Sequence, residues 1–435
     1  MSAVQTWVDE FQRRAATLPG ARAPWLSACR QRAIDRFAQQ GWPHSKQENW
    51  HHTSLALLAQ QTFETPQVQA DSKALLDALR QGEEGHWLVF VDGRHASGLS
   101  QTGALPDGAR IDTLAALLDG GDDDMQAFLG TDDDGASTQA LNLALATDGA
   151  VIRLGAGVAL DAPVHLVFIA SAQGASFPRN LIIAAENSQA TIVEHYLGAE
   201  GAVTFTNAVT RSHLGAGARI THAKLQEEGE QAFHLQAIET TQTKGSVFNS
   251  HALSFGARLA RTDIGTRFDG DGCETLLNGL YYANGRRHVD HHTRIDHAKP
   301  HGTSREYYRG ILDGSARGVF AGRIYVAEGA DRTDAVQRSD NLLLSRMAEA
   351  DTRPELEIYA DDVKCAHGAT VGQINEDSLF YLRTRGYDVA HARNLLTYAF
   401  AAEALARIPL EPLRRRAAKA IRARLPGGEM LEELA

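Results

Sequence analysis

The first fifty residues carry apolar positions at the spacing of amphipathic helices. One run lies at residues 7–11 and ends at Leu18-Pro19-Gly20, and a second lies at residues 25–37 and ends at Gly41-Trp42-Pro43. Apolar residues three or four positions apart share one face of a helix, and Pro or Gly closes such a pattern. We therefore expect two helices at the N-terminus.

The pattern changes to short apolar runs in the middle of the chain. Residues 87–94 predict a strand that ends in a turn, and residues 113–147 predict short helices and loops around acidic runs at 122–124 and 132–134. From about residue 150, Gly, Asn or Asp separates one β-type run from the next. These runs are residues 150–154, 164–169, 190–196, 218–225, 246–253, 273–277, 318–326 and 356–360.

Two architectures accommodate so many short strands. A large β-sandwich is one, and a parallel β-helix, in which each coil buries its inward face by stacking on its neighbours, is the other. Because the strands continue for more than 200 residues without a helical pattern, we favour the β-helix. The fold class is therefore mainly β, a parallel β-helix core with helical regions at both ends.

The helical spacing returns after Gly372. Apolar residues between Leu395 and Leu405 form a stripe that Asp388 is placed to cap, and Pro409 and Pro412 end it. Basic residues at 414–424 follow, which form either a docking surface or a solvated helix face. We predict three domains: a helical domain at 1–85, the β-helix with an α/β segment before it at 86–372, and a helical domain at 373–435.

Composition narrows the class of protein. The 435 residues are 43% hydrophobic and 22% charged, with a net charge of −11, which is typical of a soluble globular protein and disfavours nucleic acid as a partner. The three cysteines, Cys29, Cys273 and Cys365, are too few for a disulfide framework. Neither a signal peptide nor a membrane span is recognisable. We expect a cytoplasmic protein.

The segment Asp361-Asp-Val-Lys-Cys-Ala-His-Gly-Ala-Thr370 carries a candidate metal pair. If the extended conformation of residues 356–360 continues, Cys365 and His367 point to the same face with their Cα atoms roughly 6.6 Å apart. A thiolate beside an imidazole suits iron or zinc, and the charge of Lys364 would help to lower the thiol pKa. A closed tetrahedral site needs about two more ligands, so an open or shared site is favoured, and a purely structural pair is the alternative.

A second polar cluster runs from His288 to His301. In an extended strand, His288, Asp290, His292, Arg294 and Asp296 share one face, while His291, Ile295 and His297 share the other. These are metal-ligand residue types, but Arg294 would repel a cation. A hydrogen-bond ladder is therefore favoured over a metal site.

Motifs of known catalytic sites are missing from the sequence. It has no phosphate-binding Gly-x-x-x-x-Gly-Lys-Ser/Thr loop, no Gly-x-Ser-x-Gly elbow and no Cys-x-x-Cys pair. We therefore expect a non-catalytic protein. The alternative is a β-helical polysaccharide lyase or hydrolase that uses the His288–His301 cluster, for which a secretory signal would be expected.

Two parts of the sequence resemble the SufB/SufD family of iron–sulfur cluster assembly proteins. The longer is the block from Leu312 to Gly386, which contains the Cys365–His367 segment. The shorter comprises Gly41-Trp-Pro, Glu48 and Trp50-His-His-Thr53, in which His52 replaces the aromatic residue of the family. The sequence Cys-Ala-His-Gly-Ala-Thr and the small number of cysteines are similar to the SufD members of the family.

The resemblance implies a function as well as a fold. It implies a right-handed parallel β-helix that pairs with a SufB subunit and binds the ATPase SufC through its C-terminal helices. A transient iron–sulfur cluster is expected at the SufB–SufD interface, with His367 and its neighbour Cys365 contributing from this chain. The resemblance also links the complex to reduced FAD, although no segment of the sequence marks a flavin site. In the absence of SufB, a homodimer is expected as an alternative assembly.

Overall fold

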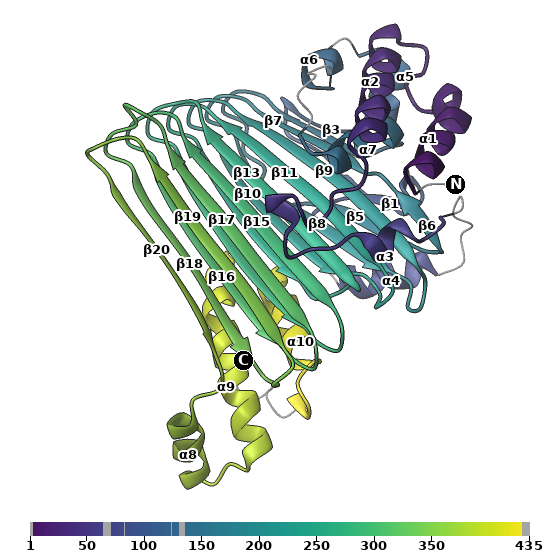
Figure 1. Cartoon of the computed structure of the whole chain (residues 1–435). Coiled ribbons are helices and arrows are strands. Elements are labelled where there is room, and N and C mark those ends of the chain that lie inside the picture. Colours follow the sequence, from purple (N-terminus) through teal and green to yellow (C-terminus); the bar gives the residue numbers. More distant parts are fainter. Residues whose placement is uncertain (1–2, 64–70, 82, 123, 130–134, 429–435) are drawn as a thin grey trace.

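The computed structural model describes residues 3–63, 71–81, 83–122, 124–129 and 135–428. Its centre is a parallel β-solenoid with helices at both ends (Figure 1). The predicted mainly β architecture is therefore confirmed, whereas the division into domains at residues 85 and 372 stays a prediction. None of the helices in these ranges has the length and apolar character that crossing a bilayer requires.

From β7 onward the chain alternates between two sheets, so that each coil contributes one strand to each. Sheet A contains β1 (His86–Val91), β2 (Arg94–His95), β5 (Val164–Ala170), β8 (Gln189–Gly198), β10 (Arg219–Glu227), β12 (Val247–Ser254), β14 (Glu274–Ala283), β16 (Thr303–Leu312), β18 (Asp334–Leu343) and β20 (Lys364–Gly372). Sheet B contains β3 (Ala109–Thr113), β4 (Ala150–Leu154), β6 (Gly174–Ser176), β7 (Arg179–Ala184), β9 (Thr204–Leu214), β11 (Phe233–Gln242), β13 (Leu259–Phe268), β15 (His288–His297), β17 (Arg317–Val326) and β19 (Glu349–Ile358).

The coil length varies while the strand register is kept. Arg219 pairs with Val247, Val247 with Glu274 and Glu274 with Thr303, which gives repeats of 28, 27 and 29 residues. The turns absorb the difference, several of them with a glycine at positive φ, such as Gly245 (φ 65°). In-register stacking keeps the inward positions of successive strands in straight columns.

The inward columns are partly apolar and partly polar. Ile192, Ile220 and Phe248 belong to the largest apolar cluster, which fills much of the space between the sheets. Deeper along the same strands, the buried Glu194 accepts hydrogen bonds from Tyr196 (2.6 Å) and other side chains. A solenoid interior normally stabilises its coils by apolar burial alone, so these buried polar groups need a separate explanation.

Helices cover the outer faces of the two sheets. The N-terminal helices α1 (Ala3–Arg14) and α2 (Pro24–Gln40), as predicted, and α7 (Ser137–Leu145) bury apolar side chains against outward residues of sheet B such as Phe205 and Phe233. The remaining N-terminal helices are α3 (Ala56–Ala59), α4 (Ser72–Arg80), α5 (Leu114–Gly120) and α6 (Met125–Leu129). Acidic residues 123 and 132–134 of the predicted loops lie outside the described residues, whereas Asp122 pairs with Arg153 (2.9 Å).

The C-terminal helices cover sheet A on the opposite side. They are α8 (Glu376–Thr384), α9 (Val389–Leu405) and α10 (Glu411–Arg422), and the predicted cap is present, since Asp388 accepts a hydrogen bond from the His391 amide (2.8 Å). Helices α9 and α10 pack on outward residues of sheet A, while α8 projects beyond the solenoid (Figure 1). The last coil, β19 and β20, therefore stays uncovered by helices on its open side.

Candidate functional site

Cys365 and His367 lie on β20, the last strand of sheet A. The prediction that the extended conformation of residues 356–360 continues into this segment is wrong: β19 ends at Ile358, and the chain turns and crosses to the other sheet before β20 begins at Lys364. The crossing follows from the coil geometry, in which each strand must be followed by one of the opposite sheet.

The two side chains share the inward face of the solenoid, as predicted. Cys365 pairs with Ala335 and His367 with Gln337, and both of these β18 residues are buried in the interior. Cys365 is half-buried against apolar residues of the last coil, whereas His367 is exposed. Both side chains therefore point along the lumen at the point where the solenoid opens.

The open end presents unpaired strand edges. Strands β19 and β20 terminate the two sheets, and no further strand pairs with either within the described ranges (Figure 1). Apolar side chains are exposed on the same coil, among them Tyr359 (61% exposed) and Val371 (48% exposed). An uncovered edge with exposed apolar residues is a template for pairing with another chain.

The electrostatics of Cys365 differ from the expectation. Burial raises the pKa of its thiol and the carboxylate of Asp334 raises it further, although a hydrogen bond from the Ala335 backbone opposes both. Lys364 points to the outer face and does not lower the pKa, so the predicted activation is wrong for the isolated chain. The thiol becomes a good ligand when a metal ion or cluster displaces its proton.

No complete metal site is formed by this chain across its described residues. There, no group of three or more His, Cys, Asp or Glu side chains is arranged to hold a metal ion. Cys365 and His367 together supply one sulfur and one nitrogen ligand, which are donors that iron–sulfur clusters accept from proteins. The remaining ligands of a cluster held here must come from outside the chain.

The His288–His301 cluster is divided among three environments. On β15, Asp290 and His292 face outward and His291 and His297 face inward, as the alternation predicts, while His301 lies in the following turn and pairs with Asp271. His297 shares a hydrogen bond with Ser304 (2.9 Å) inside the solenoid. These residues do not converge on one point. His288 and His297 form hydrogen bonds, but neither ring nitrogen of the buried His291 has a hydrogen-bond partner among the described residues, so the structure contains only part of the predicted ladder.

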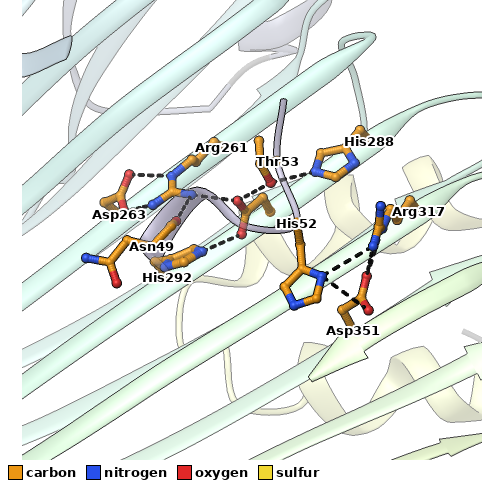
Figure 2. Close-up of polar contacts among 10 residues, drawn as sticks. Asn49, His52, Thr53, Arg261, Asp263, His288, His292, Arg317 and Asp351 are labelled. Atoms are coloured by element: carbon orange, nitrogen blue, oxygen red, sulfur yellow. Dashed lines mark hydrogen bonds and ion pairs between the residues drawn. The ribbon is translucent and has the colours of Figure 1, made fainter. Parts of the chain in front are cut away.

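The outward residues of β15 hold a segment from the N-terminus, the clasp (residues 48–53). Figure 2 shows Thr53 reaching His288, and the Thr53 hydroxyl donates to the Asp290 carboxylate (2.5 Å) while it accepts from His288 (2.8 Å). Arg261 donates to Asp290 (2.9 Å) and to the Asn49 carbonyl (2.7 Å). The clasp motif Glu48, Trp50 and Thr53 is therefore a docking element.

The clasp also reaches the last coil. His52 lies 3.3 Å from Arg317 on β17 and 3.4 Å from Asp351 on β19 (Figure 2). Glu48 pairs with Arg353, also on β19. His52 thus forms a polar bridge between two strands. The clasp connects the N-terminal region with the strand that borders the open end.

Several of these partners were not predictable from local sequence. Arg261 lies 29 residues from Asp290, and Arg317 lies 34 residues from Asp351 and 265 from His52, with no motif around any of them. A repeat of about 29 residues, had it been regular, would have aligned Arg261 with Asp290. The variable turn lengths conceal it.

The C-terminal helices present a second exposed apolar surface. Phe380 (67% exposed) and Tyr381 (56% exposed) lie on α8, and Tyr387 and Val389 lie where α9 begins. The basic helix α10 is partly committed to the fold, because Arg416 pairs with Glu227 (3.0 Å). Arg416 is thus held by the chain's own solenoid, while the choice between a docking surface and a solvated face for the other basic residues stays a prediction. The exposed apolar side chains lie on α8.

Comparison with known proteins matches most of the chain. Residues 167–400 match the family model described as the SufBD core domain of SUF system FeS cluster assembly, and residues 1–166 match the SufBD protein N-terminal region. An iron–sulfur cluster assembly SufBD family protein of Synechocystis is 33% identical over 95% of this chain and 94% of its own length.

Two further relatives extend the comparison. The iron–sulfur cluster assembly protein SufD of Escherichia coli is 32% identical, and the alignment covers 98% of both chains. The chloroplastic protein ABCI7 of Arabidopsis thaliana is 27% identical over 93% of this chain and 87% of its own length. The similarity therefore includes the clasp, the solenoid and the C-terminal helices.

Proposed function

The chain belongs to the SufBD family of iron–sulfur cluster assembly proteins, and we propose that it is a non-catalytic scaffold subunit that helps to hold a nascent cluster. The observation that carries this proposal is the position of His367 and Cys365. They face the lumen on the terminal strand β20, whose outer edge is open for a partner.

The partner in this proposal is SufB. Its terminal strands would add to β19 and β20, since parallel edges with exposed backbone groups recruit another strand by main-chain hydrogen bonds. His367 and Cys365 would then supply two ligands and SufB the others. Where SufB is missing, a second copy of this chain would present the same pair and form a homodimer.

SufC is the proposed second partner, bound through the C-terminal helices. Phe380 and Tyr381 on α8 are large and exposed, and such side chains are typical anchors of protein interfaces. Because α8 and α9 follow β20 directly, movement of SufC on ATP hydrolysis would be transmitted to the strand that carries His367. ATPase activity therefore belongs to SufC in this proposal.

Reduced FAD is not placed on this chain. The surface pocket beside Phe128, about 310 Å³, is lined by arginines that are already paired, Arg211 with Glu239 and Arg294 with Asp296. A flavin pyrophosphate needs unpaired cationic or amide donors. The residues of this pocket therefore do not fit the cofactor.

The test is cluster assembly with the complex reconstituted from this chain, SufB and SufC. We expect His367→Ala to reduce the iron and sulfide bound per complex at least several-fold while the three subunits still co-purify. His44→Ala, which changes an exposed histidine of the N-terminal region, is the matched control. Unchanged cluster content in the intact His367→Ala complex would overturn the proposal.

A further inference from the structure

A column of three inward side chains ends at His367. Glu306 on β16 pairs in register with Gln337 on β18, and Gln337 pairs with His367 on β20. Neighbouring strands of a sheet lie about 4.8 Å apart, so the three side chains stack directly along the lumen. Glu306 and Gln337 are completely or almost completely buried, and His367 is exposed at the open end.

The burial of the Glu306 carboxyl group is not explained by a contribution to folding stability. It is fully buried, and burial raises its pKa to about 7, against the opposing hydrogen bonds of neighbouring side chains. No arginine or lysine forms an ion pair with it in the described structure. Burying an unpaired carboxyl costs several kcal/mol, and Leu277 occupies the equivalent position one coil earlier.

Glu306 fixes the orientation of the Gln337 amide. The Gln337 nitrogen Nε2 donates to Glu306 Oε2 at 2.5 Å. In this orientation the amide nitrogen faces Glu306, so the carbonyl oxygen Oε1 points elsewhere. That oxygen is buried, and among the described residues it has no hydrogen-bond partner.

The Gln337 amide is closely packed against the opposite sheet. A Cβ atom added to Gly322, across the lumen on β17, would lie 2.3 Å from Gln337 Nε2 and 2.8 Å from the Phe320 ring. The glycine therefore makes the space that the amide fills. Its position is determined from two sides, by Glu306 and by β17.

We propose that Gln337, held by Glu306, is a positioning residue for His367: when the exposed imidazole turns toward the lumen, the unpartnered Gln337 carbonyl oxygen accepts a hydrogen bond from one ring nitrogen and leaves the other nitrogen free for the cluster. Histidine ligands usually donate their second N–H to an oxygen acceptor, which fixes the tautomer and the ring orientation. The inference rests on the proposed function, since it takes His367 as the ligand.

The experiment measures the tautomer of His367 in the isolated full-length chain. The protein is labelled with ¹⁵N-histidine, and the His367 signals are assigned by their loss in His367→Ala. We expect one dominant neutral tautomer in the wild type and a mixture in Gln337→Leu. Ser339→Ala is the matched control, because Ser339 faces inward on the same strand but pairs with Ala369; its spectrum should match the wild type.

A second pair of variants tests the role of Glu306 and covers the case in which Gln337→Leu does not fold. Glu306→Gln keeps an acceptor for the Gln337 amide and should preserve the wild-type tautomer, whereas Glu306→Leu removes it and should shift His367 toward the mixture. Unchanged His367 signals in folded Gln337→Leu or Glu306→Leu would overturn the inference. That outcome would leave the cluster assay of His367→Ala unaffected, so the two failures are distinguishable.

Discussion

Asp290 is the residue on which the attachment of the clasp depends. Burial opposes its ionisation, but His292 at 3.0 Å and Arg261 at 2.9 Å hold the pKa of its carboxyl well below the usual value. Arg261 is itself buried and lies 3.7 Å over the Trp50 ring of the clasp. The ion pair, the aromatic contact and Thr53 therefore form one unit.

Removing this carboxylate should destabilise the protein strongly. Asp290→Ala leaves Arg261 buried without its inner partner, and we expect a loss of about 3–5 kcal/mol in the free energy of unfolding. Asp263→Ala is the matched control, because Asp263 binds the same arginine but its side chain is 41% exposed; a loss below about 1 kcal/mol is expected. Equal losses in urea titrations would contradict the assignment.

The buried Glu306 makes a prediction about pH. Its folded pKa of about 7 lies above the ordinary value of 4.5, so the folded state binds more protons between these pH values. Stability from this group is present below about pH 4.5 and is lost as the pH rises toward 7, by about 3 kcal/mol in total. Glu306→Gln should remove this part of the decline. An identical pH dependence in both proteins would show that Glu306 titrates normally.

At the scale of elements, strands of mainly apolar sequence were predicted, whereas strands with polar inward-facing residues were not. The run at 150–154 matches β4 and the run at 318–326 matches β17 within one residue. Strands β16 and β18 were not predicted, because Ser304, Glu306 and Gln337 occupy inward positions that usually carry apolar residues. Where polar side chains hydrogen-bond to one another inside the lumen, the sequence lacks the alternation of apolar and polar positions by which a strand is recognised.

The candidate site was predictable in part for a related reason. The spacing of Cys365 and His367 was sufficient to place them on one face, since side chains two apart in a strand point the same way. That this face is the lumen, and that Gln337 lies beside His367, depends on the register between β18 and β20. Register is set by turn lengths and stacking, which a single sequence does not display.

Gly322 on β17 tests whether the lumen is fitted to Gln337. In Gly322→Ala the new methyl group meets the Gln337 amide, and we expect a loss of about 1–3 kcal/mol in the free energy of unfolding. Gly265→Ala on β13 is the control, since an added Cβ there meets nothing within 4 Å; it should be neutral or slightly stabilising. Equal stability of the two variants would argue against a tightly filled lumen.

At the scale of the whole molecule, separate surfaces serve separate tasks. The N-terminal helices and the clasp cover sheet B, the C-terminal helices cover sheet A, and the end formed by β19 and β20 stays open (Figure 1). The clasp joins the first of these regions to the third through His52 and Asp351. The proposed binding of one partner at the open end and another on α8 requires such separate surfaces.

The α8 surface predicts a binding defect that is separate from cluster chemistry. Phe380→Asp should weaken binding of SufC by at least tenfold, because it places a charge in the centre of an apolar contact. Leu57→Asp, at a residue of comparable type that is 45% exposed on α3, should bind SufC normally. Calorimetric titration of both variants decides, and normal binding by Phe380→Asp would exclude α8 as the contact.

The most direct test of the account is whether an imidazole of this chain binds the cluster. This subunit is labelled with ¹⁵N-histidine, assembled with unlabelled SufB and SufC, and the cluster is trapped in a paramagnetic state for pulsed electron paramagnetic resonance. We predict a strong ¹⁵N hyperfine coupling that disappears in His367→Ala. A cluster that shows no coupling to the labelled chain would contradict the claim that His367 is its ligand.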